Sequence, residues 1–263
     1  MRPASNRRDF ILRLTAVSAA LGGGAALTAC GGDDDEQPEF LYGVASGDPL
    51  ADRVILWTHA RFPGSDDRVA LRWEVAEDAA FTRVVASGQA TATREAGHTV
   101  KVDASGLAAG RENHYRFSYG GTRSPVGRTR TLPATASELS LAVMSCTNYP
   151  AGFFNVYAEV ARSDAQFAIH LGDYIYEYPA NGYASAGAAA LGRTSVPANE
   201  VFTLDDYRRR HAQYKSDADS KTLHARMPLI AVWDDHEIAN DAYNGGAENH
   251  DAATEGSWAA RRE

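Results

Sequence analysis

The chain has 263 residues, a formal net charge of −8 at pH 7 and only two cysteines, Cys30 and Cys146. This length allows more than one domain, and two cysteines are too few for a disulfide framework. The acidic balance argues against a nucleic-acid backbone as a partner, although bound cations can still attract an anionic phosphate substrate.

The amino terminus carries an export pattern. A twin-arginine pair lies in residues 6–12, and an apolar stretch rich in Ala, Leu and Gly follows it. Residues 27–30 resemble a bacterial lipobox, which predicts a lipid anchor on Cys30; ordinary cleavage beside an incidental cysteine is the alternative. We therefore expect a signal peptide in residues 1–30 and a flexible acidic tether in residues 31–39. These features predict export by the twin-arginine machinery to the periplasm, to a membrane anchor at the cell envelope, or to the medium.

The next part of the chain, residues 40–133, has a β pattern. Short segments alternate apolar and polar side chains and are separated by Gly, Asp and Ser turns. Their spacing favours a β-sandwich, and Leu107, Gly110 and Tyr115 form a loose version of the tyrosine corner of fibronectin type III modules. The predicted strands are 53–58, 69–75, 82–86, 98–102 and 114–119, and Gly120-Gly121 makes the last turn.

After a linker at residues 133–137 the hydrophobic period changes. A buried strand, an amphipathic helix and a second buried strand follow one another, which predicts a βαβ unit with parallel strands. An irregular stretch rich in Ala, Gly and Pro then predicts a loop over the site. The ranges are 139–146 (strand), 153–160 (helix), 166–171 (strand), 179–200 (loop), 204–214 (helix) and 228–233 (strand).

Metal-type ligands stand at the ends of these three predicted strands. Cys146 ends the first, residues 171–176 end the second, and residues 233–237 end the third. Open α/β sheets bind ligands at the carboxyl ends of their strands. A thiolate, carboxylates, a phenol and an imidazole suit a ferric ion with a divalent cation beside it, and they do not suit a closed zinc finger. The alternatives are a small buried cysteine, a tyrosine-rich turn and a solvated acidic loop.

The two later motifs have separate chemical uses. Gly172 permits a tight turn, Asp173 can bridge two cations, and Tyr176 can direct its phenolate at the same ion. Residues 234–237 supply a carboxylate for a second metal and an imidazole that can bind a phosphate oxygen or protonate a leaving alkoxide. For His170, a structural and a functional role stay open.

Together these motifs resemble the PhoD-like alkaline phosphatases, metallophosphoesterases related to the purple acid phosphatases. The resemblance implies an α/β domain of the αββα metallophosphoesterase type at residues 139–263, preceded by an all-β, fibronectin type III-like sandwich. Because family members continue well beyond this length, we expect the α/β domain to be incomplete, with only its amino-terminal part present. The segments that carry the resemblance are 145–146, 170–178, 207–215 and 233–237.

The resemblance also implies the metal ligands. It implies Fe³⁺ held by Cys146, Asp173 and Tyr176, and Ca²⁺ bridged by Asp173 and held in part by Asp235. Asp234 is the alternative to Asp235, because the sequence does not decide which of the two points inward. His236 matches the histidine beside the scissile phosphate in related enzymes.

The implied function is that of an exported phosphoric ester hydrolase. We expect it to act on phosphomonoesters, phosphodiesters or both through a metal-activated hydroxide. Two alternatives stay open: a non-catalytic surface binding module built on the sandwich, and a phosphodiesterase of the phospholipase D type in the same family.

Overall fold

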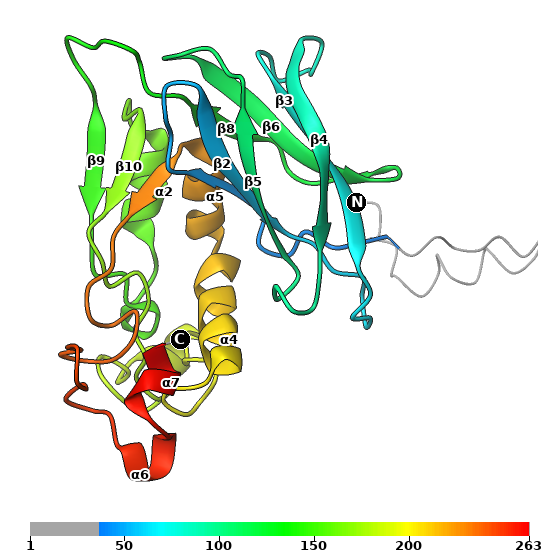
Figure 1. The fold of residues 1–263 in the computed structure, drawn as a ribbon. Coiled ribbons are helices and arrows are strands. Elements are labelled where there is room, and N and C mark those ends of the chain that lie inside the picture. Colours follow the sequence, from blue (N-terminus) through cyan, green and yellow to red (C-terminus); the bar gives the residue numbers. More distant parts are fainter. Residues whose placement is uncertain (1–36, 263) are drawn as a thin grey trace, which may run out of the picture. The chain divides into compact units, whose positions relative to one another are not determined.

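The computed structural model describes residues 37–262 (Figure 1). The predicted signal peptide, the lipobox at Cys30 and most of the acidic tether lie outside these residues. Within them, no helix combines the length and the apolar character that crossing a bilayer requires.

A five-stranded antiparallel sheet contains much of the predicted β region. Its strands are β3 (Val69–Ala76), β4 (Val84–Ala92), β6 (Glu112–Tyr119), β7 (Thr122–Arg123) and β8 (Gly127–Arg130). The order is β4-β3-β6-β7, and β8 also pairs with β6. The predicted turn is confirmed, because Gly120 and Gly121 connect β6 to β7, with Gly120 at φ +52°.

A six-stranded mixed sheet joins the β region to the α/β region. Its order is β5 (Thr99–Ser105), β2 (Arg53–His59), β1 (Val44–Gly47), β11 (Leu229–Ala231), β10 (Phe167–His170) and β9 (Leu141–Met144). The first three strands are antiparallel and the last three are parallel. The strand patterns did not predict this continuity.

The connection between β1 and β11 depends on a glycine. Gly47 pairs with Leu229 in parallel. A Cβ at Gly47 would lie 2.7 Å from the Leu229 carbonyl oxygen, so a side chain would force the strands apart.

The two sheets share one apolar core. Val44 and Leu56 from the six-stranded sheet and Leu71 and Phe117 from the five-stranded sheet are buried in the same cluster. They lie at alternating strand positions, because successive side chains point to opposite faces of a sheet. The predicted packing of two β layers is therefore present, while the fibronectin type III likeness stays a prediction.

Helices cover one face of the parallel strands. They are α2 (Asn155–Arg162), α4 (Leu204–Ser216) and α5 (Ala218–Arg226). Tyr157, Tyr214 and Leu223 from these helices pack with Met144 and Ala168 from the sheet. On the other face, the β9 side chains Leu141 and Val143 are 46% and 58% exposed, although parallel sheets are usually covered on both faces.

The α/β predictions were correct in element type and less accurate in extent. The βαβ unit of β9, α2 and β10 is confirmed, with parallel pairing of the two strands. However, β9 ends at Met144 and β11 at Ala231, so Cys146 and Trp233 follow their strands instead of ending them. Seven described elements were missed: β1, β7, β8, the 3-10 helix η1 (Tyr149–Ala151), α3 (Ala188–Leu191), α5 and α6 (Ala252–Glu255). Most are short, and α5 is polar, so each gives little periodic signal. The last helix, α7 (Trp258–Arg262), agrees with the sequence around Arg261-Arg262, which predicts the start of a helix.

Candidate metal centre

Tight backbone turns hold the two loops that follow β9 and β10 together. Cys146 and Asp173 adopt φ values of +60° and +54°, in the left-handed region that non-glycine residues rarely occupy. The amides of Cys146 and Thr147 donate to the carbonyls of Gly172 and Asp173, at 3.1 and 2.8 Å. These bonds bring the thiol-bearing loop beside the carboxylate-bearing loop.

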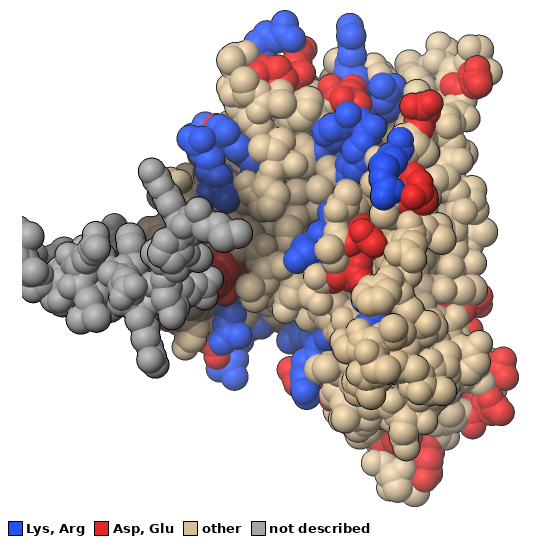
Figure 2. Space-filling view, turned by 180° about the vertical axis from the view of Figure 1, so that it is seen from behind, with Lys and Arg blue, Asp and Glu red and all other residues tan. Residues whose placement is uncertain are grey.

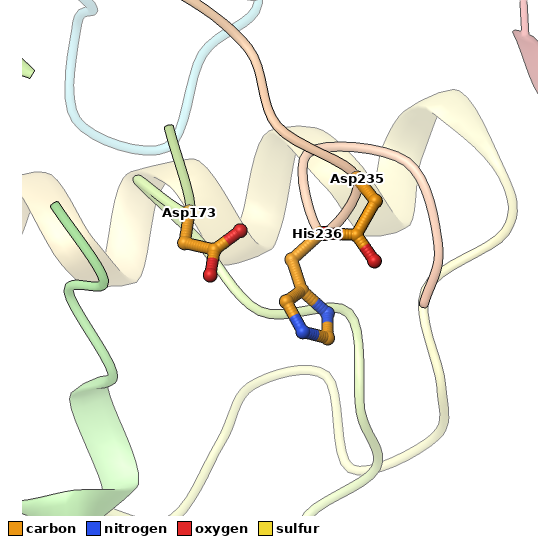
Figure 3. Close-up of side chains that lie close together, drawn as sticks. All are labelled: Asp173, Asp235 and His236. Atoms are coloured by element: carbon orange, nitrogen blue, oxygen red, sulfur yellow. The ribbon is translucent and has the colours of Figure 1, made fainter. Parts of the chain in front are cut away.

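Asp173, Asp235 and His236 form the centre of the site. Each offers a ligand atom within 4.8 Å of the others, and Figure 3 shows their side chains converging from the loops after β10 and β11. Cys146 Sγ lies 3.6 Å from Asp173 Oδ2, and the Tyr176 hydroxyl donates to the same oxygen at 3.0 Å. Five of the six predicted site residues therefore lie together.

Asp234 is the predicted residue that the structure leaves outside this cluster. Its side chain is exposed, whereas Asp235 contributes a ligand atom. The backbone at Asp234 packs closely over Gly172, where an added Cβ would lie 2.5 Å from the Asp234 amide nitrogen. Gly172 has φ +107°, so both its conformation and its surroundings exclude a side chain.

The donor set fits a cation. Asp173 Oδ1 is buried and has no hydrogen-bond partner among the described residues. In residues 37–262, no Lys or Arg forms an ion pair with Asp173 or Asp235. Burial is the main cause of a raised pKa at Tyr176, and the adjacent Asp173 carboxylate raises this pKa further. Binding as a phenolate therefore needs a cation strong enough to outweigh both effects, and a ferric ion beside thiolate and carboxylate has that character.

Glu237 holds together the loops that follow β10 and β11, here called the metal-site loops, a role that the sequence did not suggest. Its carboxylate accepts hydrogen bonds from the backbone amides of Asp173, Tyr174 and Asp234, the first and last at 3.2 and 2.9 Å. One side chain thus joins the loop after β10 to the loop after β11. The sequence shows only another acid after His236, which nothing local separates from a ligand.

Glu177 is a second carboxylate whose role only the structure shows. It is fully buried and lies 2.8 Å from His236 Nδ1. It also accepts hydrogen bonds from the Asn240 amide and the Asn249 side chain, both at 2.8 Å. Burial lowers the pKa of His236, but the hydrogen bond and charge of Glu177 outweigh it, so the net pKa is raised. His236 Nε2 is left for a ligand.

Two models of a single family match this chain. The PhoD-like phosphatase N-terminal domain matches residues 25–133, and the PhoD-like phosphatase matches residues 141–263. The chain belongs to the PhoD-like phosphatase family. The predicted family is therefore confirmed.

Individual relatives agree with this assignment. Alkaline phosphatase D of Bacillus subtilis (strain 168) is 42% identical over 214 residues, which are 78% of this chain and 36% of that protein. A solved structure described as "Structure of PhoD" is 40% identical and superposes with a TM-score of 0.75, covering 84% of this chain and 43% of the other. The chain thus spans less than half the length of either relative.

Two tyrosine rings flank the His236 imidazole in this member of the PhoD-like phosphatase family. The His236 ring lies 4.3 Å from the Tyr176 ring and 5.3 Å from the Tyr178 ring, measured between centroids. Tyr183, from the predicted loop, stacks on Tyr176 at 6.0 Å and is 61% exposed. The loop therefore does reach the site, although it contains α3.

His170 and His250, two other histidines of the α/β region, have structural surroundings in this family member. His170 is fully buried, its Nε2 lies 2.9 Å from the Thr147 hydroxyl, and burial lowers its pKa to about 4. His250 pairs with Glu255 at 3.0 Å and packs against Trp258. Neither belongs to the described group of metal-type ligands.

Proposed function

We propose that this chain is an exported, metal-dependent phosphoesterase of the alkaline phosphatase D type, acting on phosphomonoesters, phosphodiesters or both. The observation that carries the proposal is the convergence of a thiol, a phenol and carboxylates on Asp173, with His236 beside them. This donor set matches a ferric and a calcium ion more closely than a structural zinc site. Membership of a phosphatase family agrees with it.

The residues divide between two cations. Cys146, Asp173 and Tyr176 would hold Fe³⁺, and Asp173 and Asp235 would contribute to Ca²⁺. When bound, the ions would supply positive charge for the phosphate oxygens and an activated water. Asp173 suits the shared position because Oδ2 faces the thiol and phenol while Oδ1 has no partner.

The protein's own acid–base group would be His236. Glu177 binds Nδ1, which fixes the ring orientation and directs Nε2 towards the substrate. The raised pKa favours the protonated ring, which can bind a phosphate oxygen and give a proton to the leaving alkoxide. Tyr176 and Tyr178 restrict the ring from its sides.

Metal content and turnover test the proposal. The purified chain is analysed for iron and calcium, its visible spectrum is recorded, and hydrolysis of a chromogenic phosphomonoester and a phosphodiester is measured. We expect bound iron and a tyrosinate-to-Fe(III) absorption band that is lost in Tyr176→Phe and kept in the control Tyr183→Phe. A chain with neither iron nor turnover would instead support the non-catalytic binding module.

Export carries its own test. Twin-arginine export suits a protein that folds around its cofactor before transport, and a lipid on Cys30 would retain it at the envelope. Mass spectrometry of the mature amino terminus should find a diacylglyceryl group on Cys30. An unmodified start at another residue would contradict the anchor and leave export standing.

A further inference from the structure

A lysine on α4 lies between Trp57 of strand β2 and Tyr174, the residue after Asp173. Lys215 Nζ donates to the Tyr174 hydroxyl at 3.1 Å and lies 4.9 Å from the centroid of that ring. It also lies 5.1 Å from the Trp57 ring of β2. In residues 37–262 it has no carboxylate partner. The ammonium group is therefore stabilised by a hydrogen bond to a phenol oxygen and by two aromatic rings.

The alternation of β2 places Trp57 for this contact. Val54, Leu56 and Thr58 are fully buried on the face that packs into the two-sheet core. Trp57 lies between Leu56 and Thr58 and therefore points to the opposite face, towards α4. The contact thus depends on how α4 is positioned against strand β2 of the mixed sheet.

The Tyr174 hydroxyl has a second hydrogen-bond partner, His224, on α5. The hydroxyl oxygen lies 2.7 Å from His224 Nε2. Burial lowers the pKa of His224, so the ring is neutral. Lys215 can only donate, so the phenol oxygen accepts from the lysine, and a second hydrogen bond joins the phenol to His224 Nε2. A chain of hydrogen bonds therefore runs from Lys215 through Tyr174 to His224.

The other end of Tyr174 belongs to the metal-site loop. It follows Asp173 directly, and its backbone amide donates to Glu237. Tyr174 is 9% exposed, and its ring packs against His170 with the ring centroids 5.2 Å apart. A fixed Tyr174 ring therefore restricts the left-handed backbone of Asp173, the residue that the thiol and the Tyr176 phenol both contact.

We propose that Lys215 is a positioning residue that couples strand β2 of the mixed sheet to the candidate metal centre through Tyr174. Trp57 holds the ammonium from one side and Tyr174 holds it from the other. Because Asp173 directly precedes Tyr174, fixing the Tyr174 ring also fixes the backbone of Asp173. The effect on metal binding rests on the proposed function; the coupling of Trp57 to the Asp173 backbone does not.

Hydrogen exchange of the whole chain tests the coupling without metal. Lys215→Met keeps the apolar stem and removes the charge, and Trp57→Leu removes the ring on the other side. In both, we expect the Asp173 and Tyr174 amides to exchange about tenfold faster, with the double variant close to either single one because both act through one contact. Arg209→Met, which removes an exposed cation from α4, is the matched control and should leave both amides unchanged.

Two results would overturn the coupling. One is parent-like exchange at both amides in Lys215→Met. The other is a uniform increase across β9, β10 and β11, which would mean that Lys215 only contributes to global stability. Lys215→Arg should restore protection, because a guanidinium also donates to a phenol and stacks on rings.

Ferric ion titration then tests the effect on the site. We expect Lys215→Met to bind iron about tenfold more weakly than the parent, a loss of about 1.4 kcal/mol. Parent-like iron affinity would remove metal positioning from the inference. If the parent itself binds no iron, the proposed function fails, while the exchange data still decide the coupling.

Discussion

Replacing Glu237 with glutamine should loosen the metal-site loops by a predictable amount. Glu237 Oε1 accepts the Tyr174 amide, and Oε2 accepts the amides of Asp173 and Asp234. Glutamine has one acceptor oxygen, so it can keep the Tyr174 bond and must present an NH₂ donor to the other two N–H groups. Two charge-assisted hydrogen bonds are lost, each worth about 1.5–3 kcal/mol. Because water can partly solvate the freed amides, we expect a net loss of about 3 kcal/mol.

Urea unfolding measures this loss. With a slope of about 2–3 kcal/mol per molar urea, the midpoint should fall by about 1 M. Glu159→Gln is the control, because its side chain is 76% exposed and forms only a surface pair with Arg162, and it should shift stability by less than about 0.5 kcal/mol. Ferric affinity in Glu237→Gln should fall roughly 10- to 100-fold, as for other groups that orient ligands. A midpoint shift no larger than that of Glu159→Gln would refute the proposed role of Glu237.

Three further predictions concern the site and the pH dependence of stability. Glu177→Gln should lower kcat/KM roughly 10- to 100-fold with little change in Tm, because the amide keeps its size but loses the charge that supports protonated His236; unchanged turnover in an active enzyme would contradict this. Gly172→Ala should destabilise the chain by more than about 1 kcal/mol in urea unfolding and weaken iron binding, because its Cβ would collide with Asp234 at φ +107°; parent-like values for both would be the contrary result. Burial, reinforced by nearby positive charge, lowers the pKa of His59 to about 4, so the unfolded chain, with an ordinary His pKa of about 6.5, binds a proton that the folded chain does not. The unfolding free energy should therefore fall as the pH drops from about 6.5 to about 4, and less steeply in His59→Gln; an equal slope in the variant would exclude His59 as a source.

Local patterns were enough to predict most of the regular structure. Alternation over 53–58 and 69–75 predicted β2 and β3 closely, because one face of each strand is buried against a core. The short strand β1 escaped prediction, since four residues carry little periodic signal. Its pairing with β11 joins residues far apart in the chain, and no local pattern encodes such a contact.

The sequence selected side chains that the structure brings together, but it did not show how they are arranged. Cys146, Asp173, Tyr176 and His236 could be selected from the sequence because each follows a strand that ends at the same edge of a parallel sheet. Glu177 and Glu237 could not, because an acidic residue that binds backbone amides or an imidazole looks the same in sequence as one that binds a metal. Their roles emerge only from the hydrogen bonds that they accept.

The sequence by itself therefore indicated the family through its motifs and the order of the βαβ unit through its periodicity, since both are local properties of the chain. The tertiary structure decided that Asp235 joins the ligand cluster while Asp234 stays exposed. It also decided that Trp57 faces Lys215. The physical reason is that side-chain direction in a turn depends on packing against distant segments, here the close approach of Gly172 to Asp234 and of β2 to α4.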